Sequence, residues 1–168
     1  MTFKKIISTF AIGLAVLIPA SGQLQHGAHE LGDSVKHEGV DGSKVVSTAM
    51  QYIGARYRHG HAGPTAFDCS GFTSYVYRQK NITLSRSSRV QYGQGTPVKS
   101  IADLKPGDLV FFGGSKSTRT VGHVGIVKEV NPEKGDFSFV HASRTGVKVD
   151  MLSSAYYKKR YIGARRVL

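Results

Sequence analysis

The chain contains a single cysteine, Cys69, and its surroundings make it the residue best placed for nucleophilic chemistry. The apolar-periodic segment of residues 72–77 follows it directly, which would place the thiol on the first turn of a helix. The unpaired N–H groups and the positive dipole end of a helix N-terminus favour the thiolate, which is the nucleophilic form of cysteine. Most lone cysteines are small buried hydrophobes, so the residue type alone leaves both interpretations open.

Two histidines in strand-like segments, His123 and His141, are candidates to assist this cysteine. A cysteine nucleophile needs a base within hydrogen-bond reach, and the base needs a third group that fixes its tautomer and orientation. If neighbouring antiparallel strands carry the two histidines, their side chains can face one another, and the cysteine helix can pack its N-terminus against that sheet face. Each histidine alone fits a structural position, but the three residues together predict a Cys-His-His site.

Helical patterns occupy the earlier part of the sequence. Residues 43–53 have apolar side chains at helical spacing, with Ser43 as the predicted N-cap, and the cysteine helix is expected to run to about Lys80. A glycine-rich loop at residues 57–64 separates these helices, and residues 84–93 are expected to form a loop that leads into a short helical turn.

The later part of the sequence is rich in β-forming residues separated by turn residues. We expect strands at residues 108–112, 122–130, 137–142, 147–151 and 161–167. Helices followed by a meander of strands indicate an α+β fold in which N-terminal helices pack on a mostly antiparallel sheet, rather than alternating βαβ units.

Residues 1–22 have the order of regions expected of a secretory signal peptide. Lys4 and Lys5 precede an apolar run at residues 6–18, and small residues follow. The apolar run is short for a membrane span, so we expect an exported protein, periplasmic or secreted, without stable membrane insertion after signal removal. An uncleaved membrane anchor is the alternative interpretation.

The next segment, residues 23–42, is polar and glycine-containing and is expected to form a flexible linker or arm before a catalytic domain at residues 43–168. His26, His29 and His37 lie in this arm, but their spacing matches no standard metal site and no thiolate lies nearby. We therefore expect no metal and no cofactor.

The chain is strongly basic, with a formal net charge of +12 that becomes +10 once Lys4 and Lys5 are removed with the signal peptide. Basic exported proteins meet anionic envelope polymers and phospholipid head groups, although a plain solvated surface explains the charge equally well. No stacking-aromatic motif or basic groove pattern supports a nucleic-acid partner. One cysteine allows no internal disulfide, so the thiol stays free or finds another partner.

Four motifs together give the sequence a resemblance to the NlpC/P60 family of bacterial cell-wall cysteine peptidases, which have a papain-like fold. The resemblance covers residues 43–168. The motifs, in chain order, are Asp-Cys-Ser-Gly-Phe at 68–72, Pro-Gly-Asp-Leu-Val-Phe-Phe at 106–112, His-Val-Gly-Ile-Val at 123–127 and Val-His-Ala-Ser at 140–143.

The resemblance implies that Cys69 is the nucleophile, His123 the general base and acid, and His141 the polar residue that orients the base. It also implies that the Tyr57 hydroxyl lies beside the nucleophile, where it would form an oxyanion hole with the backbone N–H of Cys69. Residues of this oxyanion and substrate-binding group are Tyr57, Asp68, Ser70, Arg86 and Ser87. Local caps and ion pairs are the alternative for Asp68, Arg86 and Ser87, and simple packing of a loop aromatic residue is the alternative for Tyr57.

The implied substrate is the peptidoglycan stem peptide, hydrolysed between γ-D-glutamate and the following diamino acid. His59 and His61 stand where the family often has an aromatic residue and a glycine, so the cleft wall is expected to differ. The sequence leaves two alternatives: a CHAP-like amidase that cuts between the glycan and L-alanine, and a catalytically silent wall-binding protein. The protein would find its substrate by charge, by its cleft or through a regulatory or targeting partner.

Overall fold

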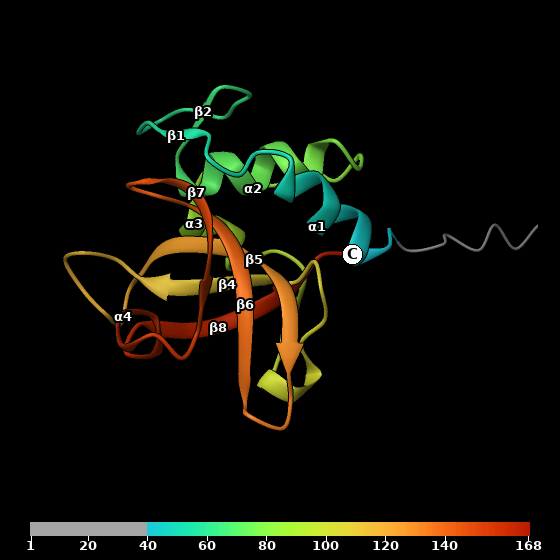
Figure 1. Cartoon of the computed structure of the whole chain (residues 1–168), viewed down its shortest axis with the longest axis vertical. Coiled ribbons are helices and arrows are strands. Elements are labelled where there is room, and N and C mark those ends of the chain that lie inside the picture. Colours follow the sequence, from blue (N-terminus) through green and yellow to red (C-terminus); the bar gives the residue numbers. More distant parts are fainter. Residues whose placement is uncertain (1–39) are drawn as a thin grey trace, which may run out of the picture. The chain divides into compact units, whose positions relative to one another are not determined.

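The computed structural model describes residues 40–168, and Figure 1 shows how these residues are arranged. The predicted signal peptide at residues 1–22 and most of the predicted arm at residues 23–42 lie outside the described residues. Within residues 40–168, no helix combines the length and the hydrophobicity that crossing a membrane requires.

Two helices precede the main sheet, α1 (Gly42–Met50) and α2 (Cys69–Arg78). The sequence predicts Ser43 as the N-cap of α1, but Asp41 takes that position. Its carboxylate accepts hydrogen bonds from the Ser43 N–H at 2.9 Å and from the Ser43 hydroxyl at 2.6 Å. A carboxylate at this end also interacts favourably with the helix dipole. Helix α1 therefore begins inside the segment that was assigned to the arm.

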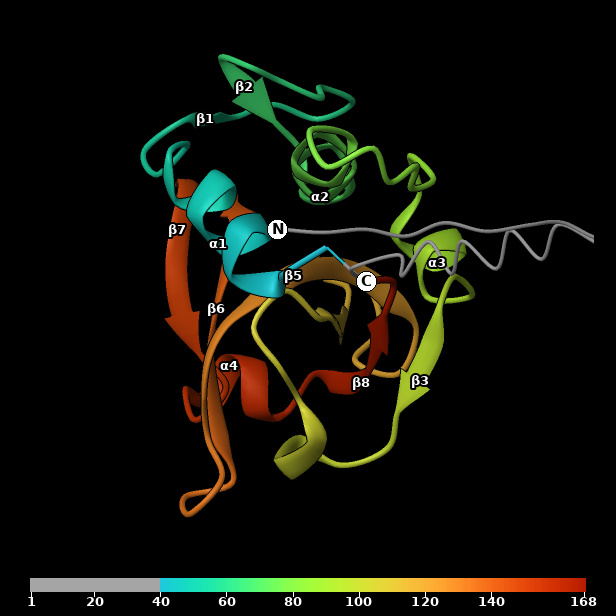
Figure 2. The same cartoon turned by 90° about the vertical axis from the view of Figure 1, so that its right-hand side faces the viewer.

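The main sheet has six strands, and every neighbouring pair is antiparallel, as the sequence predicts. Figures 1 and 2 show the strands and the helices that lie on them. In their order across the sheet the strands are β3 (Thr96–Val98), β8 (Tyr161–Arg166), β4 (Leu109–Gly113), β5 (Val121–Asn131), β6 (Asp136–Ser143) and β7 (Gly146–Met151).

Several short elements are absent from the sequence-based prediction. Strand β3 is one of them, and its central residue Pro97 suits an edge position because proline cannot donate a ladder hydrogen bond. The other unpredicted elements are too short to carry a periodic pattern: β1 (Arg56–Tyr57), β2 (Ala66–Phe67), α4 (Ala155–Lys158) and the 3₁₀ turn Ile101–Asp103. The short helical turn expected within residues 84–93 is present as α3 (Ser88–Gln91).

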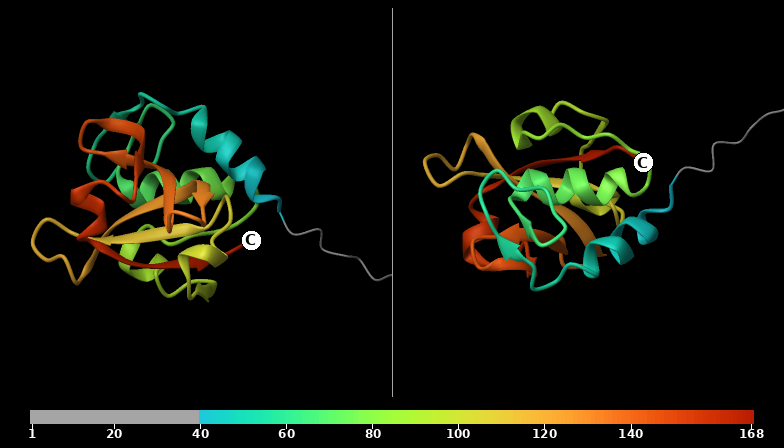
Figure 3. Two further views of the ribbon diagram at one scale, coloured as in Figure 1. Left: turned by 60° about the horizontal axis from the view of Figure 1, so that its bottom comes forward. Right: turned by 90° about the horizontal axis from the view of Figure 1, so that it is seen from above.

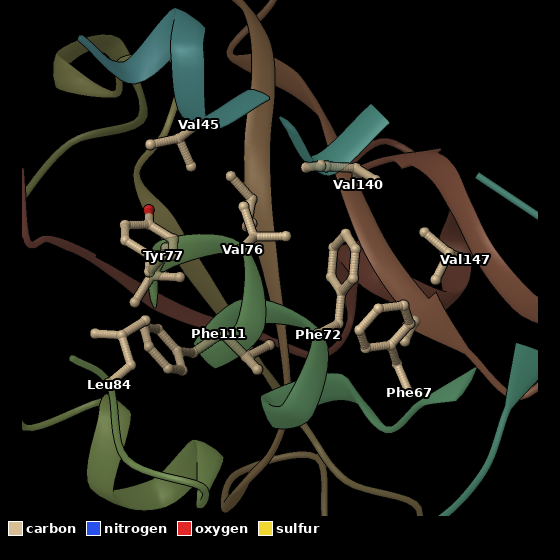
Figure 4. Close-up of a cluster of buried hydrophobic side chains, with 14 of the residues drawn as sticks. Val45, Phe67, Phe72, Val76, Tyr77, Leu84, Phe111, Val140 and Val147 are labelled. Carbon is tan, nitrogen blue, oxygen red and sulfur yellow. The ribbon is translucent and has the colours of Figure 1, made fainter. Parts of the chain in front are cut away.

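Helices α1 and α2 cover one side of the sheet, as the two views in Figure 3 show. Their apolar side chains join those of β4, β5 and β6 in a buried cluster that includes Phe72, Val76 and Val124. Figure 4 shows Phe72 and Val76 in this cluster together with Val45 of α1 and Val140 of β6. Burial of these side chains fixes α2, and with it Cys69, against the sheet.

A second buried cluster occupies the other side of the sheet and contains Phe112, Phe139 and Tyr157. Successive side chains of a strand point to opposite faces, so Val124 faces α2 while its neighbour His123 faces this second cluster. The body of α2 therefore packs on the sheet face opposite the histidines. The sequence-based expectation concerned only the N-terminus of this helix, where Cys69 lies.

Candidate active site

Cys69 is the first residue of α2, and the preceding residue holds it there. The Asp68 side chain caps the helix by accepting a hydrogen bond from the Gly71 N–H at 2.6 Å, and its second oxygen accepts one from the Gly60 N–H at 2.8 Å. The carboxylate therefore joins the glycine-rich loop to the helix. This double contact fixes the position of the partly buried Cys69 at the helix N-terminus.

Polar contacts behind the helix reinforce this arrangement. Arg86 approaches Asp68 at 3.3 Å, and the Ser70 hydroxyl donates to the Arg86 carbonyl at 2.8 Å. Gly71 has no room for a side chain, because an added Cβ would overlap the His61 carbonyl oxygen and lie 2.8 Å from the Arg86 guanidinium. The Asp-Cys-Ser-Gly motif is therefore a closely packed unit.

The two histidines contact each other across β5 and β6. His123 Nε2 and His141 Nδ1 lie 2.8 Å apart, and the two rings are nearly perpendicular, with an interplanar angle of 89°. The pairing of Ile126 with Val140 explains the contact, because it brings Gly125 beside His141 and leaves His123 two residues further along on the same face. The predicted cross-strand approach of the histidines is confirmed.

Asp150 of β7 extends this contact, and the sequence analysis did not identify it. His141 Nε2 lies 2.9 Å from Asp150 Oδ2, and the same oxygen is 2.9 Å from Lys148 Nζ. The Tyr157 hydroxyl lies 3.4 Å from His141 Nε2. Lys148 and Asp150 alternate with valines on β7, so the two charged side chains lie on one face of the strand. This alternation was the sequence feature that could have indicated Asp150 as a site residue.

A cavity of about 390 Å³ opens beside these residues. Cys69, His123 and Tyr57 line it, so the predicted nucleophile, base and oxyanion residue share one cavity. Other lining residues are Phe112, Gly113, Gly114, Ser115, Gly122, Ala142, Ser143, Arg144, Thr145, Lys148, Tyr156 and Tyr157. His141 is fully buried behind His123.

Four other predicted residues do not line this cavity. Asp68 and Arg86 form the ion pair behind the helix, and Ser70 is buried beside them. Ser87 is exposed and forms the N-cap position of α3. The contacts of Asp68 and Arg86 are the local cap and ion pair that the sequence analysis kept as an alternative, whereas the Ser87 side chain makes no capping hydrogen bond. The part of all four residues in substrate binding stays a prediction.

The thiol of Cys69 is less acidic than the helix N-terminus alone would make it. Burial raises its pKa, with a further increase from the Asp68 carboxylate, and the backbone N–H groups of Ser70, Val124 and Cys69 act in the opposite direction without reversing the shift. The backbone N–H groups at the helix N-terminus thus favour the thiolate, as expected, but burial outweighs them in the substrate-free protein. The thiol is protonated at neutral pH.

His123 is neutral under the same conditions. Burial, together with the neighbouring His141, lowers the pKa of His123 from 6.5 to about 3, although Asp150 acts in the opposite direction. A protonated thiol and a neutral imidazole in one cavity are the resting forms of a nucleophile and its general base. Burial also raises the pKa of the Tyr57 hydroxyl, which therefore remains a hydrogen-bond donor.

Comparisons with known proteins point to one family. A family model described as "NlpC/P60 family" matches residues 54–166. The chain is 39% identical over 123 residues to a "Probable endopeptidase p60" of Listeria seeligeri, a match that covers 73% of this chain and 22% of that protein. The chain thus spans about a fifth of that relative's length.

Other relatives match more of their own length. The chain is 35% identical over 150 residues to the "Murein DD-endopeptidase MepS/Murein LD-carboxypeptidase" of Escherichia coli, covering 88% of this chain and 74% of that protein. Among solved structures, an NlpC/P60 family protein from Bacillus cereus superposes with a TM-score of 0.66 at 29% identity, covering 76% of this chain and 40% of that one. The papain-like NlpC/P60 fold predicted from the sequence is confirmed.

Proposed function

The chain belongs to the NlpC/P60 family, and we propose that it is a cysteine endopeptidase that hydrolyses peptidoglycan stem peptides. The observation that carries the proposal is the shared cavity of Cys69 and His123, with His123 held at 2.8 Å by His141. The names of the relatives from Listeria seeligeri and Escherichia coli support peptidoglycan as the substrate. An intact nucleophile, base and orienting residue argue against a catalytically silent binding protein.

The proposed reaction begins with the neutral pair. His123 removes the thiol proton as the Cys69 sulfur attacks the amide carbonyl, and the oxyanion that forms accepts hydrogen bonds from the Tyr57 hydroxyl and the Cys69 N–H. His123, now an imidazolium, protonates the leaving amine. A water molecule that His123 deprotonates then hydrolyses the thioester, which regenerates the thiol. Because Nε2 of His123 is in contact with His141, Nδ1 is the nitrogen left for these proton transfers.

The charge around the cavity supports an anionic substrate. Arg144 and Lys148 line the same cavity as Cys69, and Arg144 is close enough to lower the pKa of the Tyr57 hydroxyl against the effect of burial. Stem peptides carry free carboxylates beside their internal amide bonds. An exposed guanidinium next to the oxyanion residue would bind such a carboxylate as the amide reaches the thiol.

Two bonds are candidates for cleavage. We favour the bond between γ-D-glutamate and the following diamino acid, which the family resemblance implies. A cross-link between two D-configured centres is the second candidate, because the Escherichia coli relative is named a murein DD-endopeptidase. The same thiol chemistry serves both bonds, and only the peptide that enters the cavity differs.

We further propose that the protein acts outside the cytoplasm, either in the periplasm or after secretion. The basic, apolar and small-residue order of residues 1–22 supports export, and residues 23–42 and 43–168 would then be the arm and the catalytic domain. Two residues of the arm, Asp41 and Gly42, already belong to α1 or its cap.

Mass spectrometry of purified, reduced peptidoglycan fragments incubated with the mature protein tests the proposal. Products split after D-glutamate support the favoured bond, and resolved cross-links support the second candidate. Release of the whole stem peptide identifies an amidase instead. Unchanged fragments, with a folded protein in the reaction, contradict the hydrolase and favour a binding protein.

A further inference from the structure

We propose that Asp150 is a positioning residue that sets the tautomers of both histidines and leaves the thiol-facing nitrogen of His123 unprotonated. The inference rests on the proposed function for its catalytic consequence, but the tautomers exist without substrate. The three residues concerned, His123, His141 and Asp150, are called the His-His-Asp row below.

The His-His-Asp row crosses three adjacent strands on one face of the sheet. His141 of β6 pairs with Lys148 of β7, so Asp150, two residues further along β7, points to the same face and is diagonal to His141. His123 occupies the corresponding diagonal position on β5, the strand on the other side of β6. Strand register therefore brings the three side chains into line.

A proton on His141 Nε2 follows from burial and from the partner's charge. His141 is fully buried, and a buried imidazole N–H needs an acceptor. Asp150 Oδ2 lies 2.9 Å from Nε2. Burial acts to raise the pKa of Asp150, but hydrogen bonds from Lys148 and His141 lower it overall, so its carboxylate is ionised and can only accept. Neutral His141 therefore carries its proton on Nε2 and presents a bare Nδ1.

The same reasoning about donors and acceptors determines the tautomer of His123. The bare Nδ1 of His141 lies 2.8 Å from Nε2 of His123, and one of the two must donate. Nε2 of His123 is the remaining donor, which leaves Nδ1 of His123 without a proton. A general base must be unprotonated at the atom that receives the thiol proton. Asp150 thus determines, through His141, whether His123 can accept that proton.

A surface ion pair with Lys148 is the competing explanation for Asp150. Lys148 Nζ lies 2.9 Å from Asp150 Oδ2, and both side chains are partly exposed. That ion pair does not require His141, whereas the buried Nε2 of His141 has Asp150 and the more distant Tyr157 hydroxyl as its hydrogen-bond partners. Removing Lys148 while keeping Asp150 separates the two explanations.

Long-range ¹H–¹⁵N spectra of the imidazole rings test the tautomers in the substrate-free protein. The expected wild-type result is a protonated Nε2 and a bare Nδ1 in both histidines. In Asp150→Asn, the amide can turn its NH₂ toward His141, and a protonated Nδ1 is expected to appear on both rings. A wild-type His123 with its proton on Nδ1 would overturn the proposal.

Kinetics on stem peptides supply the second readout. Asp150→Asn is expected to lower kcat by at least about 100-fold while KM changes by less than about threefold, because the protein holds the substrate but starts from the wrong tautomer. Lys148→Met is the matched control for the spectra: it removes the ion pair but keeps Asp150, and it is expected to keep the wild-type tautomers in the substrate-free protein.

Two further outcomes would overturn the proposal: wild-type kcat in folded Asp150→Asn, or the altered tautomers of Asp150→Asn appearing also in Lys148→Met. Thermal unfolding of each variant shows whether it is folded. If the wild-type protein hydrolyses no peptidoglycan, the proposed function fails, and the spectra still decide the tautomers on their own.

Discussion

Gly125 lies directly beside His141, and the absence of a side chain at Gly125 makes room for the His-His-Asp row. A Cβ at residue 125 would lie 3.2 Å from the His141 Cβ and 2.7 Å from a ring carbon of Phe139. Phe139 is fully buried in the second cluster, so it has little freedom to move away. Close packing against Phe139 and His141 therefore requires a glycine at residue 125.

Gly125→Ala is therefore expected to displace His141. Overpacking in a buried site costs about 1–3 kcal/mol of stability, and the shift of His141 should lower kcat by at least about tenfold. Thermal unfolding and kinetics on stem peptides measure both effects. Gly93→Ala is the matched control, since its nearest neighbour would be an ordinary contact at 3.4 Å. Equal behaviour of the two variants would contradict the packing argument.

Stability should depend on pH through His123. Its pKa falls from 6.5 in an exposed histidine to about 3 in the folded protein, so the unfolded state binds more protons between these values. The contribution to stability is complete above pH 6.5 and is lost as the pH falls toward 3. Urea unfolding should give a lower free energy of unfolding at about pH 4.5 than at about pH 7.

His123→Gln isolates this contribution. The variant should lose less stability on acidification than the wild-type protein, because a titrating group has been removed. An unchanged slope in His123→Gln would show that His123 is not held neutral by burial.

Alkylation of the thiol should be slow at neutral pH. Burial and Asp68 raise the pKa of Cys69 above its ordinary value of 9.0, and iodoacetamide reacts with the thiolate. The rate measured by intact-protein mass spectrometry should still be rising above about pH 9, with no labelling of Cys69→Ala. A rate that levels off below about pH 7 would indicate a thiolate stabilised by the helix N-terminus.

Arg144 should affect substrate binding more than chemistry. Its guanidinium lies in the cavity near Tyr57, where a stem-peptide carboxylate would pair with it. Arg144→Gln is expected to raise KM by about tenfold and to change kcat by less than about threefold. Lys158→Gln removes a positive charge from an exposed site that does not line the cavity and should leave KM unchanged. An equal rise in KM in both variants would indicate that the substrate is attracted by the overall positive charge rather than by Arg144.

The local parts of the site could be predicted from the sequence. Apolar spacing after Cys69 identified its helix, and β-forming runs identified the strands of His123 and His141. Binary patterning and turn residues carry this information over short distances. The antiparallel approach of the two histidines followed from the strand order.

Properties that depend on strand register and burial could not be predicted. Asp150 reaches His141 only because β7 pairs with β6 in one register, and no local pattern specifies that register. The raised pKa of Cys69 comes mainly from burial of the thiol in the folded chain. The helix N-terminus, which lowers the pKa of the thiol, is a local feature that the sequence shows. Burial, which depends on the tertiary fold, raises that pKa by more.

The measurement that most directly tests the central claim is the hydrolysis of purified stem peptides by wild-type protein, Cys69→Ala and Cys69→Ser, each verified as folded by thermal unfolding. The account predicts turnover by the wild-type protein and none above background in either variant, because the thiol forms the covalent intermediate. Full activity in a variant that lacks the thiol would contradict it.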